Sequence, residues 1–283
     1  MTAQIKRAAG IGFCLGVRRA IDILERVAAE RGWVETLGAV VHNQPVLGRL
    51  ADIGVKVVDS VADIQGEVVV TSSHGVGPEV TEEIRRRNIE VVDTTCPFVK
   101  RAQVAARRLT EAGFGTIVYG NADHPEVKGI LGRTGGQGMA TLDAASIEAA
   151  DSLPRRLGVL SQTTQIPAGF AAFVGELVAS PCFKDTELRI IDTICHDIRQ
   201  RQANALALAR ESDLVIVVGG HTSANSHHLV ELCATLTETH LVETADEIEP
   251  FWLEGKSRIG VTSGASTDEK TIDEVVTRLE AMA

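Results

Sequence analysis

The sequence predicts an α/β protein built from small, doubly wound domains. Short runs of β-branched residues alternate with amphipathic helical segments along most of the chain. Nearly continuous apolar strands of this kind are typical of parallel sheets covered by helices on both faces. The length of 283 residues leaves room for two or three such domains with sizeable cores.

Seven segments repeat the order of strand, polar turn and helix. They are residues 67–87, 89–109, 115–131, 157–177, 188–209, 213–233 and 258–279. Each turn is rich in Gly, Ser, Thr or His, and the helix that follows carries an apolar stripe. Because no low-complexity linker interrupts the alternation, any domain limits must lie inside it.

A cysteine lies at three of the predicted strand-to-helix turns. These are Cys14, Cys96 and Cys195, separated by 96 − 14 = 82 and 195 − 96 = 99 residues. Each interval accommodates one α/β domain of about 80–100 residues. We therefore expect three domains in a pseudo-threefold arrangement around a common centre. Their expected limits are 12–96, 97–194 and 195–283, with segment 1–11 adding a strand to the third.

All three cysteines lie where a helix is predicted to begin. Cys96, for example, precedes Pro97, and proline is favoured in the first helical turn. The unpaired N–H groups and the dipole at a helix N-terminus stabilise a thiolate, the form that binds metals. An alternative is that each cysteine is a small buried apolar residue, as free cysteines often are. Cys182 and Cys233 lack this context and are interpreted as structural.

The spacing of the cysteines distinguishes between kinds of metal site. A structural zinc site usually has a close C-x₂₋₄-C pair, which this chain lacks. Ligands spread over most of the chain instead favour an iron–sulfur cluster held between domains. Cubane clusters usually take four cysteines. With three, one iron would be open to water or substrate and could act as a Lewis acid.

Composition excludes several classes of protein. The formal net charge of −10 argues against nonspecific nucleic-acid binding, which needs a basic surface. No apolar stretch approaches the length of a membrane span, and the N-terminus has no signal-peptide pattern. We therefore expect a cytoplasmic protein without nucleic-acid or membrane partners. Five scattered cysteines are too few for a disulfide scaffold.

Polar residues gather at the predicted carboxyl ends of the strands, where doubly wound folds bind ligands. They include His42, His74 and His124, and the hydroxyl-rich turns 161–165, 221–226 and 262–266. Several turns open helices, whose N–H groups suit a diphosphate. Alternatives are ordinary helix caps and surface histidines. The glycines at 75 and 77 lack the spacing of a complete dinucleotide-binding motif.

Glu126, two residues after His124, is the candidate proton donor. Burial near the mouth of a closed site would raise its pKa and favour the acid form at neutral pH. The alternative is a first-turn glutamate that complements the helix dipole.

In sequence order, these elements resemble the 4-hydroxy-3-methylbut-2-enyl diphosphate reductases, the family of the last enzyme of non-mevalonate isoprenoid synthesis. The matching elements are GFCLGV, VVHN, SSHGV, DTTCP, HPEVKG, SQTT, DTIC with Arg201-Gln202, SANS and GAS. They run from residue 12 to 266, so the resemblance covers nearly the whole chain.

The resemblance implies a reductive dehydroxylation that yields isopentenyl and dimethylallyl diphosphate. One [4Fe–4S] cluster would be held by Cys14, Cys96 and Cys195, and its open iron would bind the substrate hydroxyl. Glu126 would supply a proton, with His124 in the same catalytic motif. The substrate contacts implied are His42, His74, His124, Thr163, Ser223, Ala224, Asn225 and Ser266.

The chain departs from the family pattern at a few positions. Ala224 stands where many members have serine, so a contact there would come from the backbone. Ile198 replaces a threonine, and His221-Thr222 replaces a commoner Lys-Asn pair. These changes leave the predicted ligands intact and affect only the fine placement of the substrate.

Two other classes of function stay open from the residues alone. One is a diphosphate-binding iron–sulfur sensor without turnover. The other is a thiol-dependent hydrolase or transferase, since a cysteine with a neighbouring histidine can act as a nucleophile. For the reductase we expect a ferredoxin or flavodoxin-type electron donor, and a monomer or weak homodimer.

Overall fold

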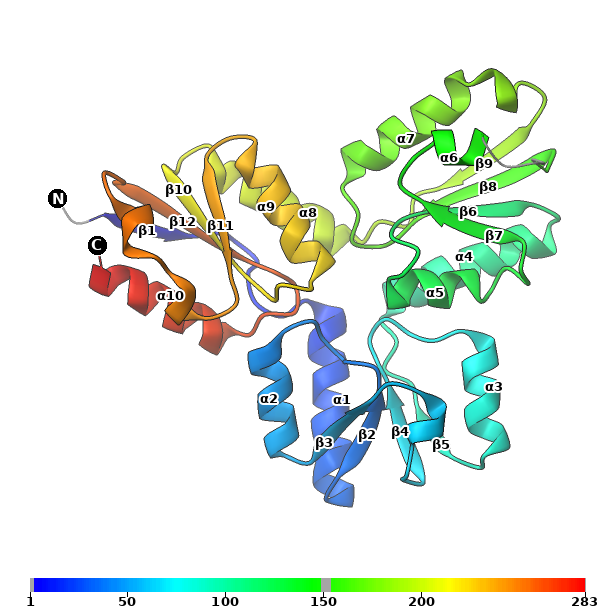
Figure 1. Ribbon diagram of the computed structural model, residues 1–283, viewed down its shortest axis with the longest axis horizontal. Helices are drawn as coiled ribbons and strands as arrows, with labels where there is room; N and C mark the ends of the chain where they lie inside the picture. The colour runs from blue at the N-terminus through cyan, green and yellow to red at the C-terminus, as the bar shows by residue number, and fades with distance from the viewer. Residues whose placement is uncertain (1–2, 149–153, 283) are drawn as a thin grey trace. The chain divides into compact units, whose positions relative to one another are not determined.

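The computed structural model describes residues 3–148 and 154–282, and it contains three four-stranded sheets with helices between the strands (Figure 1). This confirms the predicted α/β fold of three small domains. By packing, the chain divides into two compact units. One comprises Met1–Trp33, Ala39–Lys56 and His196–Ala283, and the other comprises Val34–Gly38 and Val57–Cys195. The limits 12–96, 97–194 and 195–283 stay a prediction.

The first sheet has the strand order β3-β2-β4-β5. Its strands are β2 (Val34–Leu37), β3 (Val55–Val58), β4 (Val68–Thr71) and β5 (Glu90–Val92). The helices of this part of the chain are α1 (Leu15–Arg31), α2 (Gln44–Asp52) and α3 (Pro78–Arg86), with a 3-10 turn at Val61–Asp63. Ile84 of α3 is fully buried with Leu37 and Val69 of the sheet. The apolar stripe of α3 therefore fixes that helix to the sheet.

The second sheet has the order β7-β6-β8-β9 and is covered on both faces. Its strands are β6 (Gly115–Tyr119), β7 (Gly138–Thr141), β8 (Arg156–Ser161) and β9 (Glu187–Ile191). The helices are α4 (Pro97–Glu111), α5 (Pro125–Leu131), α6 (Ala145–Glu148) and α7 (Pro167–Ala179), followed by a 3-10 turn at Pro181–Phe183. Ile117 packs with Phe170 of α7, whereas its neighbour Val118 packs with Leu109 of α4. Alternate residues of one strand thus face opposite helical layers.

The third sheet has the order β1-β12-β10-β11. Its strands are β1 (Gln4–Arg7), β10 (Leu214–Val218), β11 (Glu238–Val242) and β12 (Arg258–Ser263). The helices are α8 (His196–Ala209), α9 (Ala224–Ala234) and α10 (Glu269–Met282), and 3-10 turns lie at Ala245–Glu247 and Pro250–Leu253. Ile216 packs with Val275 of α10, and Val217 packs with Leu229 of α9. Strand β1 pairs with β12 in parallel, so the N-terminal segment completes this sheet.

All three sheets share one strand order. In each, the first strand along the domain lies between the second and the third, and the fourth lies outside the third. Strand β1 takes the fourth position in the third sheet. The strands are thus added first to one side of the first strand and then to the other. The strand order therefore reverses between the first and third strands of every sheet, and doubly wound folds bind ligands at such switch points.

Among the described residues, every helix is too short or too polar to cross a bilayer.

Candidate functional site

The three predicted ligand cysteines occupy equivalent positions in the three sheets. Each lies in the loop after the strand in the fourth position, and each is at the start of a helix. Cys14 is the N-cap of α1, Cys96 is the N-cap of α4, and Cys195 directly precedes α8. The helix positions are those predicted from the sequence. Each thiol thus lies where unpaired N–H groups favour a thiolate.

Each cysteine loop is fixed in the same way. The backbone N–H of the cysteine donates a hydrogen bond to a carbonyl in the loop after the third strand of its own sheet. The pairs are Cys14 to Ala265 at 3.0 Å, Cys96 to Ser73 at 2.9 Å and Cys195 to Thr163 at 2.9 Å. The turn that carries the cysteine is therefore joined to the turn that carries the predicted substrate contacts.

Buried threonines strengthen two of these loops. The Thr94 hydroxyl donates to the carbonyl of Thr71, and the Thr193 hydroxyl donates to the carbonyl of Ser161. The loop before Cys14 has no such threonine. There the N–H of Gly12 donates to the hydroxyl of Ser263 at 2.9 Å, so the hydroxyl comes from the opposite loop.

The five thiols differ in their environments. Cys14 Sγ accepts the N–H of Val17 at 3.4 Å, which is the contact that a thiolate at a helix N-terminus makes. Burial raises the pKa of the Cys233 thiol to about 11, and its S–H donates to the carbonyl of Ala205. Cys182 is exposed in a 3-10 turn. The donor set of Cys14, Cys96 and Cys195 fits an iron–sulfur cluster, whereas a protonated thiol inside α9 does not.

Glu126 is buried in the first turn of α5, with only 1 % of its surface exposed. One carboxylate oxygen accepts the N–H of Thr163 at 2.7 Å, and the other accepts the Thr163 hydroxyl at 2.9 Å. Burial raises the pKa of Glu126 to about 7, although both hydrogen bonds act in the opposite direction. The carboxyl group can therefore hold and release a proton at neutral pH.

His124 is the N-cap of α5 and presents a defined tautomer. Its Nδ1 accepts the N–H of Glu126 at 3.2 Å, which leaves Nε2 to carry the proton. The His74 ring lies edge-on to the His124 ring, with 5.3 Å between their centroids. His74 is followed by Gly75 at φ +69°, where a Cβ would approach a Thr95 methyl to 2.7 Å. Only glycine fits that turn.

The loop of His42 lies in the other compact unit. Asn43 caps α2 by accepting the N–H of Val46 at 3.1 Å, and the N–H of Gln44 donates to Glu243 at 2.8 Å. A Cβ on Gly220 would approach the His42 carbonyl oxygen to 1.9 Å, so this close backbone contact requires glycine. Burial lowers the pKa of His42 below its usual value, which favours the neutral imidazole.

The N-terminus of α9 carries the SANS residues. Ser223 is the N-cap and accepts the N–H of Ser226 at 3.3 Å, and Ala224 begins the helix. Asn225 is 4 % exposed, yet neither its amide oxygen nor its amide nitrogen has a hydrogen-bond partner among residues 3–148 and 154–282. Ser266 is half-buried in the loop after β12. A buried amide without partners is costly unless a ligand supplies them.

Each compact unit thus gathers part of the predicted set at the carboxyl ends of its strands. One unit holds Cys14, His42, Ser223, Ala224, Asn225 and Ser266. The other holds His74, Cys96, His124, Glu126, Thr163 and Cys195. In the second unit, Glu126 is in direct contact with Thr163, and His74 with His124.

Sequence reasoning missed the residues that hold these loops. Thr94, Thr193 and Glu243 carry no site signal in one sequence, although the DTTC and DTIC segments repeat the same threonine two residues before a cysteine. The departures from the family pattern lie partly at the surface. His221 is exposed and pairs with Glu247 at 2.8 Å, whereas Ile198 is buried in the first turn of α8.

Comparison with known proteins gives consistent matches over the whole chain. A family model described as LytB protein matches residues 5–280. A 4-hydroxy-3-methylbut-2-enyl diphosphate reductase of Dehalococcoides mccartyi (strain CBDB1) is 58 % identical over 280 residues, which is 99 % of either chain. The reductase of Geobacter metallireducens is 43 % identical over 98 % of this chain and 96 % of its own.

Solved structures agree with these matches. A structure of (E)-4-hydroxy-3-methyl-but-2-enyl diphosphate reductase, described as the terminal enzyme of the non-mevalonate pathway, aligns with a TM-score of 0.70 at 34 % identity. The alignment covers 99 % of this chain and 100 % of the other. A Plasmodium falciparum reductase structure aligns with a TM-score of 0.91 over 98 % of this chain and 88 % of its own, and at 24 % identity it supports the fold alone.

The three sheets of one topology, each with a cysteine at the same helix start, define a class of three-domain α/β enzymes. Within that class, the chain belongs to the LytB protein family. The resemblance found in the sequence motifs is thereby confirmed, and so is the prediction of an enzyme.

Proposed function

We propose that this chain reductively removes the allylic hydroxyl of (E)-4-hydroxy-3-methylbut-2-enyl diphosphate. Two electrons and two protons enter, the carbon–oxygen bond breaks, and the oxygen leaves as water. The products are isopentenyl and dimethylallyl diphosphate. Family membership and the names of relatives at 58 % and 43 % identity support this reaction. A ferredoxin or flavodoxin-type protein in the cytoplasm supplies the electrons.

The observation that carries the proposal is the buried carboxyl group of Glu126. The reaction needs a proton at a site from which bulk water is excluded, and Glu126 is 99 % buried with a pKa of about 7. Thr163 fixes both carboxylate oxygens, so the proton is held at a defined place. Glu126 is therefore assigned as the proton donor.

The cofactor proposed is one [4Fe–4S] cluster with Cys14, Cys96 and Cys195 as its protein ligands. When bound, the cluster would pass electrons from the donor protein to the substrate and would offer an iron open to the substrate oxygen. The equivalent positions of the three thiols, one after the fourth strand of each sheet, support this ligand set.

The diphosphate is assigned to hydrogen-bond donors at helix N-termini. The side-chain amide of Asn225 has no hydrogen-bond partner for its oxygen or its nitrogen among the described residues, so its N–H₂ is available to a phosphate oxygen, and Ser223 lies at the same end of α9. His124 presents an Nε2–H donor, since its Nδ1 accepts from Glu126. The full set of proposed contacts is His42, His74, His124, Thr163, Ser223, Ala224, Asn225 and Ser266.

An anaerobic assay tests the proposal. The full chain is given the substrate and reduced methyl viologen, and both diphosphate products are quantified. We expect turnover that depends on the reductant and on bound iron. A brown protein that binds the substrate without reducing it would indicate an iron–sulfur sensor. A colourless, iron-free protein that still converts the substrate would indicate a thiol-dependent enzyme. Either result would contradict the proposal.

A further inference from the structure

A pocket of about 320 Å³ lies apart from the residues assigned above. It is formed within one compact unit by β4, α3, β5, α4 and the segment after α5. None of the proposed cluster ligands or substrate contacts lines it. Its volume is in the range of sites that bind small molecules.

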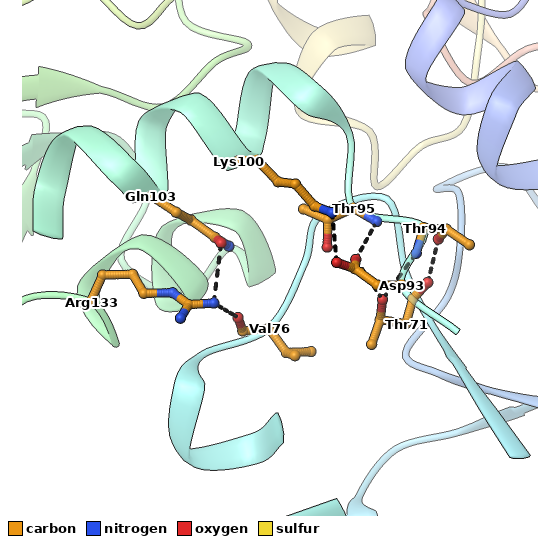
Figure 2. A network of polar contacts seen from close by, with 8 residues as sticks. All are labelled: Thr71, Val76, Asp93, Thr94, Thr95, Lys100, Gln103 and Arg133. Atoms are coloured by element: carbon orange, nitrogen blue, oxygen red, sulfur yellow. Dashed lines mark hydrogen bonds and ion pairs between the residues drawn. The ribbon is translucent and has the colours of Figure 1, made fainter. Parts of the chain in front are cut away.

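The wall of this pocket is strongly cationic. Arg85, Lys100, Arg107 and Arg133 line it, and Asp93 contributes the one lining carboxylate. Lys100 and Asp93 neutralise each other through an ion pair at 2.6 Å (Figure 2). Three guanidinium groups therefore remain in excess over the lining carboxylate, and of these Arg107 makes a weak ion pair outside the lining, with Glu111 at 3.6 Å. The formal net charge of the chain is −10.

Two buried donors in the pocket wall lack acceptors. Gln103 is 6 % exposed, and its Nε2 has no hydrogen-bond partner within the described ranges 3–148 and 154–282. The same holds for Nε of Arg133. Through Nη2, Arg133 makes two long hydrogen bonds, at 3.4 Å to the carbonyl of Val76 and at 3.4 Å to Gln103 Oε1 (Figure 2). Buried donors of this kind are costly in the free protein and are stabilised by an acceptor-rich ligand.

We propose that this pocket binds a phosphate-bearing small molecule. Guanidinium groups match phosphate oxygens in pairs, and Nε2 of Gln103, which has no acceptor among the described residues, adds a neutral donor. Val76, Val91 and Val104 form an apolar part of the wall beside the cations. The pocket therefore suits an organic phosphate or diphosphate with a short apolar group. The site does not depend on the function proposed above, because the two share no residue.

Matched arginine pairs allow a direct test. Arg85 and Arg107 line the pocket, whereas their neighbours Arg86 and Arg108 on the same two helices do not. The double variant R85M/R107M loses one weak exposed ion pair, Arg107–Glu111. The control R86M/R108M also loses one, Arg86–Glu82. The two variants therefore have equal net charge and comparable losses outside the pocket.

The probes are inorganic pyrophosphate and dimethylallyl diphosphate, titrated calorimetrically into the anaerobic full-length holoenzyme. We expect two sites per chain for dimethylallyl diphosphate, the pocket and the substrate site. R85M/R107M should weaken one of them by about tenfold or more, since each lost contact is charge-assisted. R86M/R108M should leave both unchanged. Gln103→Met should weaken the same site while the chain unfolds at an unchanged or higher temperature.

The outcomes separate this site from the proposed function. The pocket is supported, even if the enzyme proves inactive, by a diphosphate site with two properties. That site keeps its affinity in Asn225→Leu and loses affinity in R85M/R107M. If dimethylallyl diphosphate binds the pocket more tightly than pyrophosphate does, the apolar wall contacts the organic group of the ligand. If the two affinities are equal, the pocket recognises the phosphate groups alone. The proposal would be overturned if R85M/R107M and R86M/R108M changed the affinity equally. It would also be overturned if R85M/R107M weakened none of the sites.

Discussion

Both carboxylate oxygens of Glu126 are held by one residue, Thr163, whose N–H lies at 2.7 Å and whose hydroxyl lies at 2.9 Å. The backbone carbonyl of Thr163 in turn accepts the N–H of Cys195. The proposed proton donor and a proposed cluster ligand are thus fixed by the same turn. Under the proposed function, Thr163 would therefore hold the proton donor Glu126 and the cluster ligand Cys195 next to each other.

The first prediction concerns Glu126→Gln. The amide keeps the size of the side chain and one acceptor oxygen for Thr163, and its NH₂ can donate to the Thr163 hydroxyl oxygen, but the transferable proton is removed. We expect turnover to fall by about 10²-fold or more, with unchanged iron content. Glu35→Gln is the control, because Glu35 is also fully buried and accepts two backbone N–H groups, from Gln65 and Gly66. Near-normal turnover in Glu126→Gln would exclude it as the donor.

The second prediction concerns the pH dependence of turnover. Activity that needs protonated Glu126 falls as the pH rises through its pKa of about 7. The Thr163 hydroxyl lowers that pKa, so Thr163→Val should raise it and move the falling limb of kcat/KM to higher pH. A limb that stays in place, or moves to lower pH, would contradict the assignment.

The third prediction concerns stability. The pKa of Glu126 is raised in the folded state from 4.5 to about 7, so the folded chain binds more protons between these values. Its contribution is fully present below pH 4.5 and is lost as the pH rises through about 7. Over that window the free energy of unfolding should fall by about 3 kcal/mol more in the parent than in Glu126→Gln. Parallel pH profiles, measured by anaerobic denaturant titration, would show that Glu126 is not desolvated.

The fourth prediction concerns Asn225→Leu. Removing a buried amide without partners should leave the free enzyme as stable or more stable, while substrate affinity falls about tenfold or more. The control is Asn204→Leu, since Asn204 donates to the carbonyl of Ala9 at 2.8 Å. That variant should lose stability and keep its affinity. If Asn225→Leu loses stability and binds the substrate normally, the amide has a structural role only.

Much of the fold could be predicted from the sequence. All seven predicted segments form a strand followed by a helix, because buried parallel strands leave continuous apolar runs. Five strands fall outside those segments: β1, which was expected from segment 1–11, and the four unpredicted strands β2, β3, β7 and β11. The four unpredicted strands are short, and β7 (GMAT) and β11 (ETHLV) carry few large apolar residues, so the hydrophobic pattern alone does not reveal them.

The site was predictable only in part. The helix positions of Cys14, Cys96 and Cys195 follow from local sequence, since a proline or an amphipathic stripe marks each helix start. The contact between Glu126 and Thr163 joins residues 37 apart and depends on the pairing of β6 with β8. The cationic pocket likewise joins α3 to α4 and to Arg133, and no local pattern indicates that these arginines share one wall.

The central claim is a cluster held by three cysteines, and metal analysis of five single variants tests it most directly. Anaerobically purified parent protein should contain about four iron and about four sulfide ions per chain. Cys14→Ser, Cys96→Ser and Cys195→Ser should each lose most of both, whereas Cys182→Ser and Cys233→Ser should keep them. Full iron and sulfide in any of the first three, or their loss in either of the last two, would contradict the ligand set.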